Sequence, residues 1–162
     1  MTSKAINEFK EVMHQGMIAN FKIHGFLTPV VFFYKDGEAL ISEIPHQLLS
    51  TPEGKSIIAA GIKDFCTQPN VFAAGMIIEA YGAAIGKDED DEMTKLINNG
   101  NMRVRDLKQK QDIIVMIFST PEGEDMISYV VDPNSKTVGK RFVENGHGAT
   151  GRFSNFFSWN KN

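Results

Sequence analysis

Apolar residues recur every three or four positions over residues 3–20, a spacing that places them on one face of a helix. Thr2 or Ser3 can cap this helix, because its side-chain oxygen can accept a hydrogen bond from a free backbone N–H of the first turn. The apolar face consists of Ala5, Ile6, Phe9, Val12, Met13 and Met17. The sequence therefore predicts an amphipathic N-terminal helix.

Two extended segments follow, separated by an Asp-Gly pair. Residues 30–34 are β-branched or aromatic, and Pro29 suits the start of a strand. Residues 39–44 form the second extended run. Asp36-Gly37 between them is typical of a two-residue hairpin turn, whose central residues both need a positive φ. We expect a β-hairpin here.

A second helix is predicted to begin at Pro52, with Thr51 as its N-cap. Proline suits the first helical position because the N–H that it lacks would have no partner there. The helix is expected to end near Gln68, since the residue before Pro69 is driven out of helical geometry. Its apolar face should cover a sheet.

The rest of the chain reads mainly as strands. Residues 71–83 are almost wholly apolar and predict a central strand, and further strands are expected at residues 113–118, 126–132 and 137–143. We therefore expect an α+β fold, an antiparallel sheet of five to six strands with an N-terminal helix and one covering helix, and with the helices on one face. The predicted order is helix, strand, strand, helix and then at least three strands. This order is similar to that of the roadblock, longin and profilin-like folds.

Composition and charge narrow the class of protein. The 162 residues are 42% hydrophobic and 23% charged, which is typical of one globular domain. We assign residues 1–145 to that domain and residues 146–162 to a glycine-hinged aromatic tail. The single cysteine, Cys66, excludes an intramolecular disulfide, and no apolar run reaches 18 residues. We expect a cytoplasmic protein without a membrane partner.

Glu79 is the first candidate for a functional side chain. It lies in the apolar run of residues 71–83, where a carboxylate must be paired, neutralised or exposed in a cleft. The two-residue period of a strand places Ile77, Glu79 and Tyr81 on one side. Glu79 and Tyr81 are thus candidate catalytic residues, with Arg103 and Arg105 as candidate ligand-binding residues for an anion. The alternative is a glutamate that only pairs with a cation of the neighbouring strand.

Three segments together resemble a pattern found in uncharacterised small bacterial and phage proteins. They are Leu27-Thr28-Pro29-Val30, Ile78-Glu79-Ala80-Tyr81, and Arg103-Val104-Arg105-Asp106-Leu107 before the strand at Asp112. This sequence departs from the pattern at Tyr81, where a tryptophan is more usual. The resemblance implies an α+β fold and no particular activity.

No motif points to a metal or a cofactor. The four histidines lack the close pairing of metal sites, and the acidic run at residues 88–92 lacks the spacing of a calcium loop. Residues 146–151 match G-x-G-x-x-G by letter, but they do not lie in a βαβ unit. We expect neither a metal nor a cofactor.

The C-terminal tail concentrates aromatic side chains in a basic segment. Residues 133–162 carry five cations and one anion, although the whole chain has a net charge of −3. The four aromatic residues of the tail are Phe153, Phe156, Phe157 and Trp159. They can fold back on the body of the protein, dock on a second subunit or a protein partner, or, within residues 136–162, stack on single-stranded nucleic acid.

These observations favour a small non-enzymatic binding or regulatory protein that acts through self-association or a protein partner. Two alternatives stay open. One is a small hydrolase-like enzyme or ligand-binding protein with a pocket around Glu79, and the other is a protein that binds single-stranded nucleic acid through the tail.

Overall fold

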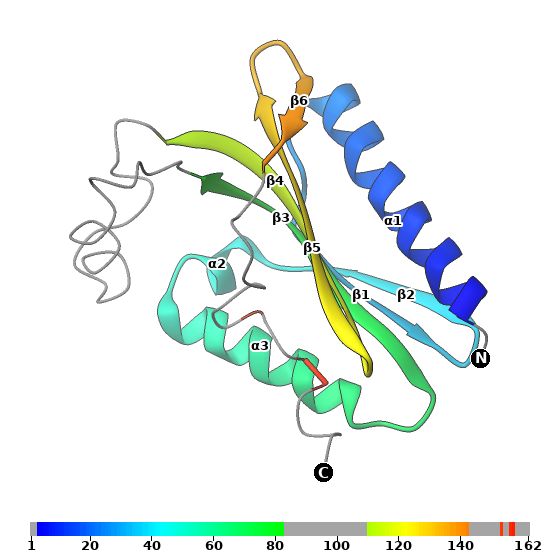
Figure 1. Ribbon diagram of the computed structural model, residues 1–162. Helices are drawn as coiled ribbons and strands as arrows, with labels where there is room; N and C mark the ends of the chain where they lie inside the picture. Colours follow the sequence, from blue (N-terminus) through cyan, green and yellow to red (C-terminus); the bar gives the residue numbers. More distant parts are fainter. Residues whose placement is uncertain (1–2, 83–109, 143–152, 154–155, 158–162) are drawn as a thin grey trace, which may run out of the picture.

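The computed structural model describes residues 3–82, 110–142, 153, 156 and 157, which form one open antiparallel sheet with helices packed on it (Figure 1). The helices are α1 (Ser3–His24), α2 (His46–Leu49) and α3 (Pro52–Cys66). The strands are β1 (Val30–Lys35), β2 (Glu38–Glu43), β3 (Val71–Gly82), β4 (Gln111–Thr120), β5 (Gly123–Asp132) and β6 (Thr137–Arg141). The six strands lie in the order β2-β1-β3-β4-β5-β6. The predicted α+β class and the order of the elements are confirmed.

The hairpin and the second long helix form for the reasons that the sequence suggested. Asp36 and Gly37 have φ values of 52° and 84°, so both turn residues adopt the positive φ of a two-residue hairpin. The hydroxyl of Thr51 accepts a hydrogen bond from the N–H of Gly54 at 3.0 Å, which caps α3. The short helix α2 precedes this cap and was not predicted.

The helices lie on opposite faces of the sheet, so the expectation that they share one face is wrong. Successive residues of β4 point to opposite faces: Ile114 and Met116 pack with α1, whereas Ile113 and Val115 pack on the α3 side. Because both faces of β3 and β4 are apolar, each needs a covering layer. Figure 1 shows α1 on one side of the strands and α3 on the other.

Part of the C-terminal tail belongs to the α3 side of the core. Phe156 and Phe157 are buried there together with Ile62 and Cys66 of α3, and Phe153 packs against the same cluster. Figure 1 places the two short red segments of the tail beside α3. In this structure the chain's own body covers these rings.

A helix that spans a membrane must be both long and apolar, and none of the described helices combines the necessary length with sufficient apolar character.

Candidate functional site

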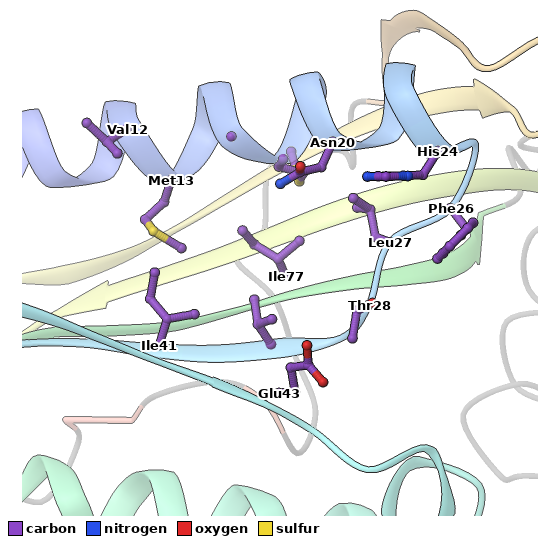
Figure 2. Close-up of a pocket in the computed structure, with 13 residues that line it drawn as sticks. Val12, Met13, Asn20, His24, Phe26, Leu27, Thr28, Ile41, Glu43 and Ile77 are labelled. Carbon is purple, nitrogen blue, oxygen red and sulfur yellow. The ribbon is translucent and has the colours of Figure 1, made fainter.

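An open groove of about 440 Å³ lies between α1 and the β1–β2 hairpin (Figure 2), and we call it the α1–β2 groove. From α1 it is lined by Val12, Met13, Gly16, Met17, Asn20 and His24. From the loop after α1 and from the strands it is lined by Phe26, Leu27, Thr28, Val30, Ile41, Glu43 and Ile77. Its walls are therefore mainly apolar, and its polar groups are few.

The groove exists because α1 crosses the sheet at a slant. Near its N-terminus the ring of Phe9 stacks on that of Tyr34 of β1, with ring centres 5.0 Å apart. Near its C-terminus the carbonyl oxygen of Ile23 lies 3.4 Å from the amine of Lys136, which immediately precedes β6. The C-terminal half of α1 consequently diverges from β1 and β2, and their side chains on this face are left partly uncovered.

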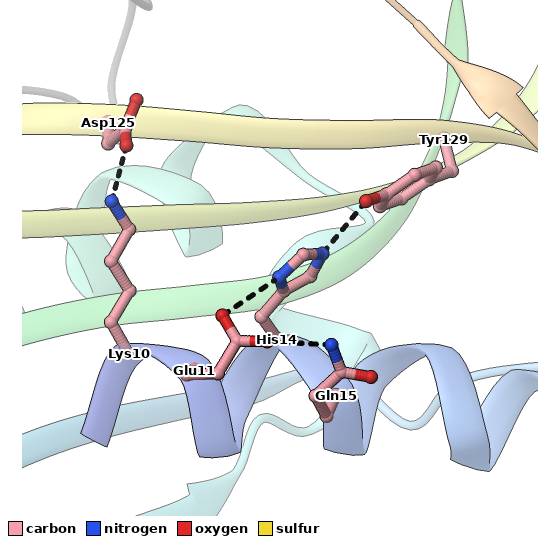
Figure 3. Close-up of polar contacts among 6 residues, drawn as sticks. All are labelled: Lys10, Glu11, His14, Gln15, Asp125 and Tyr129. Atoms are coloured by element: carbon pink, nitrogen blue, oxygen red, sulfur yellow. Dashed lines mark hydrogen bonds and ion pairs between the residues drawn. The ribbon is translucent and has the colours of Figure 1, made fainter. Parts of the chain in front are cut away.

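Polar contacts hold α1 on the β5 side of the sheet, away from β2 (Figure 3). Lys10 forms an ion pair with Asp125, and Nε2 of His14 lies 2.9 Å from the hydroxyl of Tyr129. Nδ1 of His14 is 3.7 Å from the carboxylate of Glu11, whose pKa is lowered chiefly by a hydrogen bond from Gln15. These contacts fix the position of the helix that forms one wall of the groove.

Glu79 binds the backbone of the loop after α1, which forms part of the groove wall. Its side chain is exposed, and Oε1 accepts a hydrogen bond from the backbone N–H of Leu27 at 2.8 Å. The alternative to a functional role was a glutamate that pairs with a cation of the neighbouring strand. Among the described residues the partner of Glu79 is instead this N–H. Leu27 lines the groove, so Glu79 positions a wall residue, although its own carboxylate is not part of the lining.

Of the other predicted site residues, Tyr81 lies two residues beyond Glu79 on the same face of β3. Tyr81 is exposed, and its ring lies 4.9 Å from the amine of Lys110. Arg103, Arg105 and Trp159 lie outside the described residues. The described part of the chain contains no group of three or more His, Cys, Asp or Glu side chains that could hold a metal.

Strand β2 forms the open side of the groove and an edge of the sheet. All six of its residues are exposed, and no described strand pairs with its outer side. Lys35 and Glu38 flank the two-residue turn, and the N–H of Ile44 donates to the carbonyl of Pro29 at 2.8 Å. Backbone hydrogen bonds between antiparallel strands alternate, so Ala39, Ile41 and Glu43 turn their N–H and C=O groups outward.

The two edges of the sheet differ in how they are protected. Natural edge strands are commonly shortened, charged or irregular, which prevents pairing with other chains. β6 has five residues, ends in Lys140 and Arg141, and follows an irregular register on β5. In contrast β2 pairs regularly with β1 and carries Leu40 and Ile41 exposed on its two faces. Both edges carry charges, since β2 holds Glu38 and Glu43, so the difference lies in the regular register and the exposed apolar side chains of β2. Within the described residues β2 is therefore the edge more open to pairing.

Some residues of this site fit the apolar patterns of a helix or a strand, so periodicity alone predicts that they are buried. Val12 fits the apolar face of the first helix and Ile41 fits a strand, yet their exposed fractions are 68% and 58%. Gly16 leaves a gap in the side chains on the groove side of α1, and no atom beyond the adjoining backbone of the helix lies within 4 Å of where its Cβ would be. The feature of the sequence that indicates this site is the pair of apolar residues, Leu40 and Ile41, on the two faces of a strand that lies at an edge of the sheet.

Comparisons of the chain with protein-family models, with curated proteins and with solved structures find no match.

Proposed function

We propose that this protein is a non-enzymatic binding protein that acts through another protein chain. In this proposal an extended segment of the partner pairs with β2 and inserts apolar side chains into the α1–β2 groove. The observation that carries the proposal is the six-residue exposed edge of β2 directly beside an open apolar groove. In strand addition, backbone hydrogen bonds supply affinity and side-chain pockets supply specificity.

The chemistry of the groove suits binding better than catalysis. Among the described residues its lining holds one carboxylate, Glu43, and one imidazole, His24. Within the described part of the chain neither side chain forms a hydrogen bond to the other or to a nucleophilic side chain. An acid–base mechanism needs such groups within hydrogen-bond reach of each other or of a substrate. The apolar lining and the outward backbone groups of β2 are features of a docking surface.

Site-specific photocrosslinking in the cell that makes the protein tests this proposal. A photoreactive phenylalanine analogue is placed at Val12 or at Ile41, and at Ile57 of α3 as the control. The control is matched, because Ile57 is 63% exposed but lies far from the groove lining. We expect one discrete protein adduct from Val12 and Ile41 and none from Ile57.

A second variant ties the adduct to the groove itself. Gly16→Phe places a ring in the space beside Gly16 and should reduce the adduct from Ile41 about tenfold. Gly61→Phe on α3 is its control, since Gly61 also has open space around its Cβ position. If Val12 and Ile41 give no more adduct than Ile57, the proposed function is wrong.

A further inference from the structure

We infer that the chain docked on β2 is a second copy of this protein, paired edge to edge about a two-fold axis at Ile41. The inference rests on the proposed function and names the partner. Closed two-fold dimers are the commonest protein oligomers, and each copy uses the same surface. The structural requirement is that β2 pair well with itself in antiparallel orientation.

The backbone restricts the possible self-pairings. Only Ala39, Ile41 and Glu43 present outward N–H and C=O groups, so each must face one of the same three residues in the second copy. Pairing Ile41 with Ile41 sets Ala39 opposite Glu43 at both ends. This register is the one that engages all three outward residues of each strand, and it forms about six hydrogen bonds.

The charges on β2 agree with the same register. Glu38 and Glu43 are the charged residues of the strand. A pairing of Glu38 with Glu43 would oppose like charges, but it would also set an inward-facing residue against an outward-facing one, so the backbone pattern excludes it. In the Ile41 register Glu43 faces the methyl group of Ala39. The strand therefore pairs with its own copy without opposing two charges.

Side chains that are exposed in one copy would be covered in the pair. Residues opposite each other on antiparallel strands point to the same face, so the two Ile41 side chains meet on the α1 face. Leu40 lies opposite Ser42 on the α3 face. The axis stands perpendicular to the sheet, so both α1–β2 grooves lie on one face and each borders the Ile41 of the other copy. The two sheets become one continuous sheet ending in the two protected β6 edges.

A cysteine scan with sedimentation analysis tests the dimer and its register. We expect the purified 18.0 kDa chain to sediment at twice this mass at about 100 µM. A single cysteine on a two-fold axis lies next to itself, whereas one a residue away meets its own copy only diagonally, about 7–8 Å away. Dibromobimane, which joins thiols a few ångströms apart, should therefore crosslink Ile41→Cys about tenfold faster than Leu40→Cys or Ser42→Cys.

The native thiol of Cys66 does not interfere with the crosslinking of the introduced cysteines. Cys66 is buried, and burial raises the pKa of its thiol to about 12, so it reacts slowly at neutral pH. The matched pair Ile41→Lys and Ile57→Lys completes the test, since each replaces an exposed isoleucine with lysine. We expect Ile41→Lys to raise the dimer dissociation constant at least tenfold, because it opposes two lysines at the axis, and Ile57→Lys to leave it unchanged.

Each remaining outcome is decisive. A chain that stays monomeric overturns the second copy as partner; a photocrosslinked adduct of a different protein at Ile41 would then leave the proposed function standing. A dimer that Ile41→Lys does not weaken places the interface elsewhere. Faster crosslinking at Leu40→Cys or Ser42→Cys overturns the register.

Discussion

At the scale of the residue, one glycine of this chain is tightly packed and two others have open space around them. A Cβ at Gly75 in β3 would lie 2.1 Å from the carbonyl oxygen of Ile117 and 2.3 Å from the ring of Phe32. At Gly16 in α1 and Gly61 in α3 a Cβ would meet no atom within 4 Å beyond the adjoining backbone of its own helix. Gly75 therefore allows the close approach of β4 and the core, whereas the helical glycines only lower the stability of their helices.

We expect Gly75→Ala to lower the free energy of unfolding by about 3 kcal/mol or more, since backbone and ring must both move. Gly16→Ala and Gly61→Ala should each raise it by about 0.5–1 kcal/mol through helix propensity. Urea titrations followed by circular dichroism measure all three. A Gly75→Ala variant as stable as the parent would contradict the packing of Phe32 against β3.

At the scale of the element, Glu79 joins β3 to the loop that follows α1. Its Oε1 accepts the N–H of Leu27 at 2.8 Å, and Leu27 is a buried wall of the groove. A glutamine at this position keeps the accepting oxygen and an alanine does not. The two variants thus separate a positioning role from a role that needs the charge.

We expect Glu79→Ala to lower the free energy of unfolding by about 1 kcal/mol, the usual net contribution of one hydrogen bond. Glu79→Gln should retain most of this stability. Hydrogen exchange of the Leu27 amide gives the local readout, faster in the alanine variant and close to the parent in the glutamine variant. Equal losses in both variants would show that the carboxylate charge, and not the hydrogen bond alone, is required.

Apart from the short helix α2, the elements followed from local patterns, but their placement did not. Asp36-Gly37 and Thr51-Pro52 fix a turn and a cap through their own backbone chemistry, so sequence predicts both. The slant of α1 depends on partners such as Asp125 and Tyr129, more than a hundred residues away along the chain. The groove that results from this slant was therefore beyond a reading of local periodicity.

At the scale of the whole molecule, the sheet is covered on both faces, and no described element covers its β2 edge. The alternation of Ile113 and Ile114 shows why one layer of helices is insufficient, because adjacent apolar residues on a strand face opposite ways. Tail residues complete the layer on the α3 face, where Phe156 and Phe157 pack near Cys66. Composition indicated that the tail rings needed a cover, but it left the choice of cover open.

Because Phe156 is buried against the body of the protein, the stability of a variant at this position tests whether the body is what covers the tail rings. Its side chain is 0% exposed, so Phe156→Ala should remove about 3–5 kcal/mol of stability. Phe26→Ala is the matched control: its ring is 58% exposed at the groove, and we expect a change within about 0.5 kcal/mol. Both are measured by thermal and urea unfolding of the full chain. If Phe156→Ala matches the parent in stability, the tail does not stabilise the body. The tail rings then become available to a protein partner or to single-stranded nucleic acid, and retention on a polyanion matrix before and after removal of residues 146–162 would distinguish these two.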